Sequence, residues 1–508
     1  MPDVLTAPRA LRIHETDTVA VAVEALEAGA EVLGVTLRAD VPAGHKIALV
    51  PHAEGDAVVK YGFPIGRATE AIAPGEWVHS HNLATRLSGE DEYSYDPVDT
   101  DRPAARDVPT WAGYRRPDGR VGTRNELWVL NTVGCVNRAA ERIARAVDAR
   151  FGPEGEGVID GAHAFAHPYG CSQLGDDLGH TRQLLARLAA HPNAGGVLVL
   201  GLGCENNQLD AFLQEADRTD GRVRGFAAQH VLDEVEEGTT LAEEIVGLMR
   251  SDQRETVSAA DLVLGFKCGG SDGFSGVTAN PLVGRVADRV AAWGGRGILT
   301  EVPEMFGAER VLMQRATDRG VFERTVDLVN DFKRYFLDHN QPVYENPSPG
   351  NKDGGLTTLE EKSLGAIQKG GRAPVAEVVR YTGRASVPGH DGFRPGLALL
   401  ESPGNDGVSS TALTAAGAAL VLFTTGRGTP LGFPAPTVKI ATNDAVAARK
   451  PHWIDFSAGP LLTGEADLDG LADRFVADLL AIASGRRRTR NETNDYREIA
   501  IWKAGVTL

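Results

Sequence analysis

GGVLVLGLGCENN, residues 195–207, joins a continuous apolar run to a loop of glycine and polar residues. LWVLNTVGCVN, residues 127–137, has the same arrangement, and the helix-like stretch RAAERIARAVDARF follows it. Apolar runs that alternate with amphipathic stretches are typical of α/β layers with a parallel or mixed sheet. The central part of the chain is therefore predicted to be α/β.

A second α/β unit is predicted after a break near residues 251–261. Its candidate strands are apolar runs bounded by glycine or polar residues: LVLGFK (262–267), GGRGILTEV (294–302), GLALLES (396–402), AALVLFTT (418–425) and TVKIAT (437–442). The two α/β units are therefore assigned to residues 113–250 and 251–508.

The N-terminal part has a different pattern. Residues 11–85 contain short apolar stretches between Pro and Gly turns, which favours a small β-rich module. VAVAVEALEA, residues 19–28, is predicted to form its one short helix. Residues 88–111 are rich in Asp, Pro and Arg and lack apolar periodicity, which indicates a linker. The predicted first domain covers residues 1–95 and the linker residues 96–112.

Composition excludes several classes of partner. The net charge of -17 over 508 residues disfavours nucleic acid and anionic membranes, because both need a basic face. No apolar run approaches the ~18 residues that span a bilayer. The few, widely spaced cysteines indicate a reducing, cytoplasmic compartment. They are Cys135, Cys171, Cys204 and Cys268. A small-molecule ligand is expected, and a homo-oligomer is left open.

Candidate strands run directly into small-residue loops with polar groups. In open α/β sheets, loops at the carboxyl ends of strands line the ligand crevice, and glycine lets backbone amides approach a ligand. Turns or packing devices are the alternative. GLGCENN has Asn in place of the third glycine of a dinucleotide loop, and GxxxxGK[ST] does not occur, which disfavours nucleotide chemistry. The loops include HPYGCSQLGDD (167–177), KCGGSDGFSGVTANP (267–281), NPSPGNKDGG (346–355), SPGNDGVSS (402–410) and TTGRGTPLG (424–432).

WVHSHNL places His79 and His81 two residues apart. On a strand such a pair projects from one face, so both imidazoles can reach one metal ion. The alternative is that they are polar residues at a strand end. His14 and His45 could lie near them in a small barrel.

Longer motifs make a resemblance specific. They are GRVGTRNELWVLNTVGCVN, YGCSQLGDD, GLGCENNQ, CGGSDGFSGVTANP, TEVPEMFGAE, YENPSPGNKDGGLTTLEEKSLG, FTTGRGTPLGF, PTVKIATN and HWIDFSAG. In these strings the chain resembles the altronate/galactarate dehydratase family of sugar-acid hydro-lyases, and the likeness extends from the region of His14 to the tail at residues 494–508. WVHSHNL, YGCSQLGDD and the ENNQ form resemble the altronate enzymes more than the galactarate ones.

The resemblance implies an N-terminal SAF-type domain, a divalent metal and dehydration of D-altronate to 2-keto-3-deoxy-D-gluconate in hexuronate catabolism. The metal that it implies is usually iron or manganese. We therefore expect Fe²⁺, with Mn²⁺ as the alternative. The resemblance does not identify the ligands of this metal.

The expected reaction sets requirements for the site. The proton α to a carboxylate is a very weak acid, so it leaves only if positive charge stabilises the enediolate. The site needs a metal, a base, an acid for the leaving hydroxyl and a cation for the carboxylate. His14, His79 and His81 are the metal candidates, since iron accepts imidazole readily.

The cysteines provide an alternative metal site. Three of Cys135, Cys171, Cys204 and Cys268 could hold an iron–sulfur cluster whose open iron acts as the Lewis acid. They lack a compact CxxC spacing. Small buried residues in Gly-rich loops are the other interpretation.

His163, His167 and Lys267 are candidate bases, provided that burial or a neighbouring charge lowers the pKa of the group. Glu304 is predicted to provide an acid or a metal carboxylate. Glu301 and Glu304 lie three residues apart in TEVPEM, and such a pair is usually a helix-start signature.

The substrate-binding candidates lie on Gly-rich loops. Arg427 in TTGRGTP and Lys352 in PGNKDGG could each present a cation to the substrate carboxylate. Asn405 in SPGNDG is placed with them. A structural ion pair is the alternative for both cations. Rival functions are a lyase for galactarate or a sulfonated hydroxy acid, and a sugar-acid binding protein without catalysis.

Overall fold

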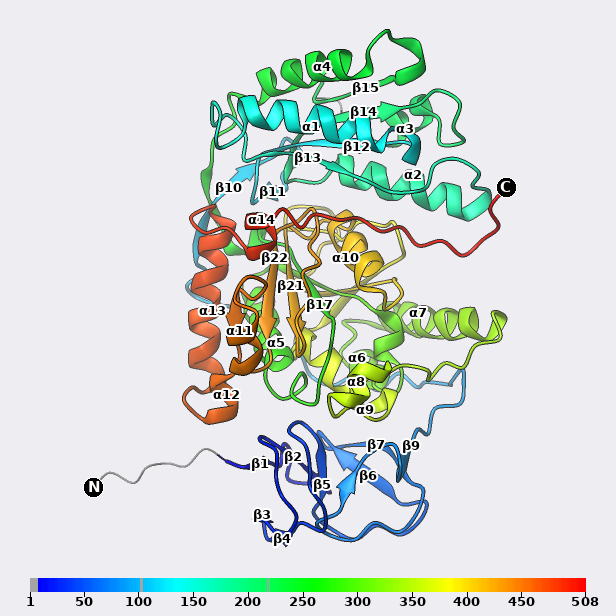
Figure 1. Cartoon of the computed structure of the whole chain (residues 1–508), viewed down its shortest axis with the longest axis vertical. Helices are drawn as coiled ribbons and strands as arrows, with labels where there is room; N and C mark the ends of the chain where they lie inside the picture. Colours follow the sequence, from blue (N-terminus) through cyan, green and yellow to red (C-terminus); the bar gives the residue numbers. More distant parts are fainter. Residues whose placement is uncertain (1–7, 101–103, 217, 219) are drawn as a thin grey trace, which may run out of the picture.

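The computed structural model describes residues 8–100, 104–216, 218 and 220–508. Residues 1–7 of the predicted first domain and 101–103 of the predicted linker lie outside the described residues. A β-rich module forms one end of the elongated molecule, a large α/β unit the middle, and a smaller α/β unit the other end (Figure 1). This arrangement confirms the predicted fold class.

The N-terminal module is built from short antiparallel strands. The first sheet has the order β1-β2-β5-β8 and the second β6-β7-β9. The strands are β1 (Ala10–Leu11), β2 (Val19–Ala22), β3 (Glu31–Val32), β4 (Val35–Thr36), β5 (Lys46–Ala48), β6 (Ala57–Lys60), β7 (Phe63–Ala68), β8 (Trp77–Val78) and β9 (Leu83–Ala84).

The predicted helix over residues 19–28 is wrong. Val19–Ala22 forms strand β2, whose four residues are all buried between β1 and β5. The alternating valines have β-branched side chains, which pack well on a pleated surface with neighbours on both sides.

The stretch 88–111, which lacks apolar periodicity, packs on the body of the protein, beginning before the predicted linker boundary at residue 96. The hydroxyl of Tyr93 donates to Glu309 at 2.5 Å and accepts from Lys333 at 3.0 Å, and the ring of Tyr95 contacts Phe322. The chain then enters β10 (Thr110–Arg115), which pairs with β11 (Val121–Gly122) and β16 (Glu255–Ser258). This small sheet crosses the predicted boundaries at 112 and 250, and the domain division stays a prediction.

The smaller α/β unit has a four-stranded parallel sheet in the order β13-β12-β14-β15. Helices α1 and α4 cover one face and α2 and α3 the other (Figure 1). Both faces are therefore buried, which explains the continuous apolar run in β14. The bounds are β12 (Glu126–Asn131), α1 (Asn137–Phe151), β13 (Ala162–Phe165), α2 (Gly175–Ala189), β14 (Ala194–Gly201), α3 (Leu209–Ala216), β15 (Val223–Ala227) and α4 (Glu234–Met249).

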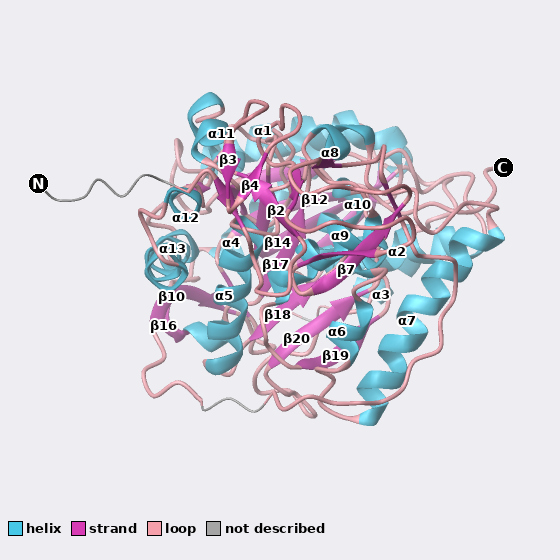
Figure 2. Ribbon diagram, turned by 90° about the horizontal axis from the view of Figure 1, so that it is seen from below, coloured by secondary structure: helices cyan, strands magenta, loops and turns pink. Residues whose placement is uncertain are grey.

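The larger unit has seven parallel strands in the order β19-β20-β18-β17-β21-β22-β23. Figure 2 shows β18, β20 and β19 side by side, with α7 (Arg319–Asp338) along that edge. The five apolar runs predicted as strands contain five of these seven strands. The bounds are β17 (Leu264–Cys268), β18 (Arg296–Leu299), β19 (Val375–Val379), β20 (Gly396–Leu400), β21 (Leu420–Thr425), β22 (Thr437–Ala441) and β23 (Phe456–Ser457).

The strand order places a topological switch between β17 and β21. The chain leaves β17 towards β18 on one side and leaves β21 towards β22 on the other. Ligands of open α/β sheets bind at such a point. Within the described residues, no helix is long and apolar enough to cross a membrane. The other helices are α5 (Ala279–Ala292), α6 (Glu309–Met313), α8 (Pro349–Asp353), α9 (Leu359–Ala366), α10 (Asp406–Ala415), α11 (Asp444–Arg449), α12 (Pro460–Thr463), α13 (Leu468–Ala483) and α14 (Arg490–Thr493).

Candidate active site

A cavity of about 460 Å³ opens at this switch point. The loops after β17, β18, β20 and β21 contribute to its wall, together with the loop 346–351 and one face of α7. Its polar wall includes Cys268, Glu304, Asn351, Lys362, Asp406 and Arg427, and its apolar wall includes Phe332, Tyr335 and Phe336. The Gly-rich loops at 267–281, 346–355, 402–410 and 424–432 therefore line a crevice, whereas those at 131–137, 167–177 and 201–207 do not contribute to it.

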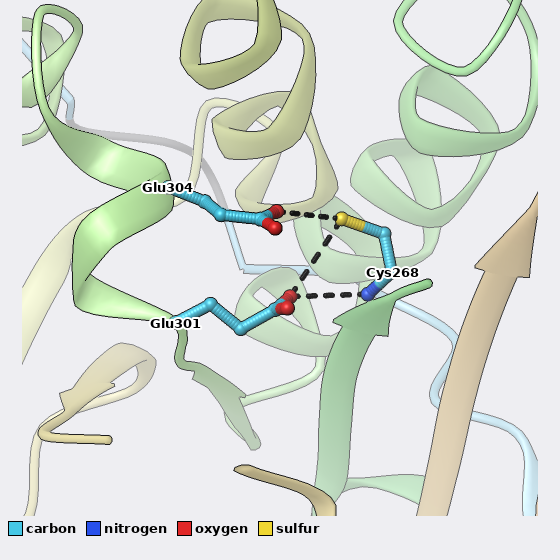
Figure 3. A group of neighbouring side chains, drawn as sticks. All are labelled: Cys268, Glu301 and Glu304. Carbon is cyan, nitrogen blue, oxygen red and sulfur yellow. Dashed lines mark hydrogen bonds between the residues drawn. The ribbon is translucent and has the colours of Figure 1, made fainter. Parts of the chain in front are cut away.

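Cys268 ends β17 and contacts two carboxylates from the segment after β18 (Figure 3). Its thiol donates to Glu304 at 3.0 Å, and its backbone N–H donates to Glu301 at 3.1 Å. The three side chains offer donor atoms within 4.8 Å of one another. They are the one such trio among the described residues.

Three lysines surround these acids. Lys267 pairs with Glu301 and with Asp406. Lys369 Nζ lies 3.2 Å from Glu301, and Lys362 Nζ lies 2.8 Å from Glu304. All these side chains except that of Asp406, which is about a third exposed, are almost fully buried.

The protein tolerates these buried ionised groups because their charges balance. Three ammonium groups face three carboxylates, and ion pairing of this quality offsets the cost of desolvation. A cation bound to Glu301 and Glu304 would have to displace lysines that already occupy those oxygens. The trio with Cys268 therefore fits a lysine network better than a metal centre.

The pKa values follow from burial and pairing. Burial alone would lower the pKa of Lys267, but the carboxylates of Asp406 and Glu301 raise it overall. Burial opposes ionisation of Glu304, yet Lys362 and Lys369 lower its pKa to about 2. Burial, with the nearby acids Glu301 and Glu304, raises the pKa of the Cys268 thiol to about 12. At neutral pH Lys267 is thus an ammonium, Glu304 a carboxylate and Cys268 a thiol.

Backbone geometry fixes Glu301 in this network. Its φ of 70° is left-handed, a region that non-glycine residues rarely occupy, and such strain clusters at functional sites. Although Glu301 precedes the 3₁₀ turn Val302–Met305, its side chain does not cap that turn. The two glutamates thus mark the start of a short helix, as the spacing indicated, but the side chain of Glu301 pairs with Lys267 and Lys369 instead of capping the turn. Close packing matters at Gly269 as well, where a Cβ would lie 2.6 Å from Asp406.

The segment 346–357, which includes α8, forms the opposite wall of the cavity. Asn351 donates to the carbonyl of Ser271 at 2.9 Å and accepts from Lys362 at 3.1 Å, so it orients that ammonium. Arg427 is exposed and donates to the carbonyl of Gly350 at 2.8 Å. Its guanidinium therefore lies at the cavity mouth, where it could also contact an anion.

Of the predicted catalytic and substrate residues, Lys267, Glu304 and Arg427 lie in or beside this cavity. Lys267 does not meet the condition set for a base, because its pKa is raised. The low pKa of Glu304 argues against the predicted acid. Asn405 is exposed and accepts from Val408 N–H at 3.1 Å, so it caps α10. Lys352 is half-buried on α8, next to Asn351.

The predicted bases His163 and His167 lie in the smaller α/β unit. His163 is on β13, 3.7 Å from Glu126, and burial lowers its pKa. Both nitrogens of His167 contact backbone: Nε2 lies 2.9 Å from the Asn131 carbonyl, and Nδ1 accepts from Tyr169 N–H at 3.2 Å. His167 thus has no free nitrogen for a substrate, and neither histidine lines the cavity at the switch point.

The N-terminal histidines are only partly brought together. Trp77 stacks on His79 with ring centroids 5.4 Å apart and contacts His81 at 5.3 Å. His45 lies 5.0 Å from His79, whereas His14 contacts Thr16 and the turn at Gly62. The group that assembles is therefore His45, His79 and His81 rather than one that includes His14.

His79 also contacts the segment 346–357, part of which lines the cavity. Its Nδ1 lies 3.1 Å from the hydroxyl of Thr357, and burial together with Lys46 lowers its pKa to about 4. The imidazole is therefore neutral at pH 7, as metal ligation requires. His45 has both nitrogens engaged, Nδ1 by the Trp77 indole and Nε2 by the Asp353 carbonyl.

Several site residues escaped the sequence prediction. Lys362, Lys369 and Asp406 lie far along the chain from β17, and no spacing rule connects them. Lys362 and Asp406 do occur within the Gly-rich strings YENPSPGNKDGGLTTLEEKSLG and SPGNDGVSS, which were the available signal. Lys369 in IQKGG carried none.

Comparison with protein families matches three consecutive parts of the chain. Residues 8–86 match the altronate/galactarate dehydratase SAF domain. Residues 113–250 match the D-galactarate dehydratase/altronate hydrolase second domain, and residues 259–507 match the D-galactarate/altronate dehydratase C-terminal domain.

Three characterised relatives cover nearly the whole chain. An altronate dehydratase of Escherichia coli (strain K12) is 51% identical over 98% of this chain and 99% of its own. An altronate dehydratase of Bacillus subtilis (strain 168) is 49% identical over the same shares. A galactarate dehydratase (L-threo-forming) of Escherichia coli (strain K12) is 33% identical over 94% of this chain and 93% of its own.

Proposed function

The chain belongs to the altronate/galactarate dehydratase family, and on that premise we propose that it removes water from D-altronate to give 2-keto-3-deoxy-D-gluconate in hexuronate catabolism. Identity near one half with two altronate dehydratases, against one third with a galactarate dehydratase, supports altronate as the substrate. The unpaired cysteines are consistent with a reducing, cytoplasmic location.

The observation that carries the mechanism is the Glu304–Lys362 pair in the cavity wall. The two groups lie 2.8 Å apart, and both line the space where a ligand would sit. The Glu304 carboxylate is a weak base while Lys362 and Lys369 face it, because the two ammonium groups lower its pKa to about 2. An anionic substrate that draws Lys362 towards itself would weaken this effect and make Glu304 more basic.

Dehydration then needs two proton transfers. Glu304 accepts the proton from C2, next to the substrate carboxylate, and the electrons form the enediolate. Lys362 donates a proton to the C3 hydroxyl, which leaves as water while the C2–C3 double bond forms. Tautomerisation of that enol gives the 2-keto acid. Glu304 is now neutral and Lys362 an amine, and proton transfer across the pair restores both charges.

The other cations have supporting roles in this proposal. Arg427 at the cavity mouth binds the substrate carboxylate, since a guanidinium presents a planar fork to it. Lys267 and Lys369 are positioning residues that hold Glu301 and add positive potential where the enediolate forms. Such local charge lets a protein of net charge -17 attract an anion.

We propose Fe²⁺ as the cofactor, with Mn²⁺ as the alternative. When bound, such an ion supplies a Lewis acid for the carboxylate and 2-hydroxyl. His79 has a neutral imidazole whose Nδ1 is oriented by Thr357, and exposed His81 follows two residues later, although neither residue lines the cavity at the switch point. His14 does not fit the same set, since it faces the turn at Gly62.

The test is a panel of hexonates and hexarates assayed for 2-keto acid formation, with and without added Fe²⁺. Altronate should give the highest kcat/KM, and chelation should abolish turnover. Faster turnover of galactarate would contradict the substrate assignment, and binding without turnover would indicate a binding protein.

Glu304→Gln tests the site, with Glu309→Gln as a matched control. Both changes break a buried pair with a lysine, but the Glu309–Lys333 pair does not line the cavity. Glu304→Gln should lower kcat by roughly 10²- to 10⁴-fold, the usual contribution of a general base. The control should lose stability yet keep the turnover of the folded enzyme. Equal turnover in both variants would refute Glu304 as the base.

A further inference from the structure

Three cysteines lie outside the cavity network, on the loops that follow neighbouring parallel strands. Cys135 follows β12, Cys171 follows β13 and Cys204 follows β14, and these strands are adjacent in the order β13-β12-β14. Because the carboxyl ends of parallel strands meet at one edge of a sheet, the three loops share that edge. All three residues are exposed and unpaired, unlike buried Cys268.

Hydrogen bonds join the three loops beside the cysteines. Gly134 N–H, next to Cys135, donates to the carbonyl of Tyr169 at 2.9 Å. Asn207 N–H, in the loop of Cys204, donates to the carbonyl of Gly170 at 2.9 Å. Each bond lies within three residues of a cysteine, so the backbone fixes the positions from which the thiols project.

The loops are also in close contact, so that one loop cannot shift without displacing its neighbour. A Cβ at Gly170 would lie 1.9 Å from the carbonyl oxygen of Thr132, and one at Gly134 would lie 2.7 Å from that of His167. The two bonds that hold His167 to Asn131 and Tyr169 add to this contact. His167, unused by the proposed mechanism, thus has a role in shaping the cysteine loops.

The spacing of the sulfurs argues against one mononuclear ion. Two sulfurs bound to a single ion at about 2.3 Å each can be no more than about 4.6 Å apart. Across the residues that the structure describes, only Cys268, Glu301 and Glu304 place three donors within 4.8 Å of one another. At least one pair among the three thiols is therefore more than 4.8 Å apart, which excludes a single ion bound by all three sulfurs in this arrangement.

Three helix N-termini offer positive potential near the cysteines, part of which Asp176, Asp177 and Asp210 in the first turns of α2 and α3 already neutralise. Helices α1, α2 and α3 begin at Asn137, Gly175 and Leu209, each within five residues after one of the cysteines. The free N–H groups and the positive dipole end of a helix N-terminus favour negative charge. A cluster held by thiolates carries such charge.

We propose that Cys135, Cys171 and Cys204 bind an iron–sulfur cluster. Three thiolates would hold three irons of a four-iron cluster and leave the fourth iron without a cysteine ligand. This site goes beyond the proposed dehydration, because the cluster forms without substrate and none of the three cysteines lines the cavity at the switch point.

The experiment uses the full chain, purified without oxygen and reconstituted with Fe³⁺, sulfide and a thiol that reduces part of the iron to Fe²⁺. Iron and acid-labile sulfide per chain, the visible absorbance and the electron paramagnetic resonance spectrum of the reduced protein are measured. Cys135→Ser, Cys171→Ser and Cys204→Ser should each lose sulfide and the visible band. Cys268→Ser is the matched control and should keep both, with circular dichroism to verify that every variant is folded.

Iron without sulfide in the wild-type protein would overturn the cluster, as would equal loss of sulfide in Cys268→Ser. Retention of sulfide in any two of the three other variants would also overturn it. These readouts need no turnover. A protein that holds the cluster but does not act on altronate would therefore contradict only the proposed function, and the converse result would contradict only the cluster.

Discussion

Glu361→Gln should loosen the N-terminal module from the rest of the molecule. Glu361, at the start of α9, accepts from Lys46 on β5 and Lys60 on β6, each at 2.8 Å, and all three side chains are almost fully buried. One carboxylate therefore compensates two ammonium groups across the contact between the module and the larger α/β unit.

The magnitude follows from the pKa of this carboxyl. Burial opposes its ionisation, but Lys46 and Lys60 lower its pKa from 4.5 to about 2. That difference corresponds to about 3 kcal/mol of stabilisation. Breaking a buried ion pair by removing one partner costs about 3 to 5 kcal/mol, which agrees. Exchange protection of the contact should fall by roughly a hundredfold or more.

Lys46→Met provides the control. Burial lowers the pKa of Lys46 to about 8 despite the raising effect of Glu361, so this ammonium is held less firmly than that of Lys60. Its removal leaves a one-to-one pair but also deletes the hydrogen bonds to Gly355 and Thr357, so it should cost less than Glu361→Gln without being neutral. Hydrogen–deuterium exchange of peptides from β5 and β6 measures both changes, since global unfolding of a multidomain chain is not one transition. Equal protection in the wild type and Glu361→Gln would refute the reasoning.

The same carboxyl sets a pH dependence. Its folded pKa is depressed, so its contribution is complete above pH 4.5 and is lost as the pH falls from 4.5 towards 2. The difference in protection between the wild type and Glu361→Gln should shrink in that window. A constant difference from pH 7 to pH 3 would show that another group carries the contact.

Two further predictions concern the ligands of the proposed reaction. Arg427→Lys should raise KM, and Arg427→Ala should raise it more, by roughly ten- to hundredfold, because a charge-assisted contact of about 1.5 to 3 kcal/mol is lost; unchanged steady-state kinetics in stable variants would remove Arg427 from substrate binding. His79→Ala and His81→Ala should each raise the Fe²⁺ concentration for half-maximal activity by roughly tenfold or more, and full activity of both at limiting iron would exclude the histidine site.

The sequence was sufficient for the inner strands of both α/β units, because each is a short apolar run buried on both faces of a parallel sheet, whereas the edge strands β13, β15, β19 and β23 were not predicted. GGVLVLG and LVLGFK are such runs, and they form β14 and β17. Residues 19–28 were wrongly predicted as a helix, because the apolar sequence VAVAV does not distinguish helix periodicity from strand periodicity. There the neighbouring strands β1 and β5 decided the outcome.

The site was only partly predictable, because its contacts depend on strand order. Lys267 meets Glu301 since β17 lies beside β18, and it meets Asp406 since α10 begins at the end of β20. Nothing in the spacing of these residues encodes that order. Loops that follow apolar runs could be identified as site loops, whereas the pairing among their side chains could not.

The segment 346–357 contacts both the cavity and the N-terminal module. On one side Arg427 and Lys362 hold its residues Gly350 and Asn351 at the cavity. On the other, the carbonyl oxygen of Gly44 approaches so closely that a Cβ at Gly355 would lie 2.3 Å from it.

Lys46 donates to the carbonyl of Gly355 at 2.8 Å, and His79 contacts Thr357. Because the segment 346–357 is bonded to the module as well as to the cavity residues, a displacement of the module should also move Asn351. Asn351 orients the Lys362 ammonium. Loosening the module through Glu361→Gln should therefore lower kcat as well as exchange protection, although Glu361 does not line the cavity. If kcat stays normal while protection falls, the segment keeps its shape without the module, and the module acts through His79 and His81 alone.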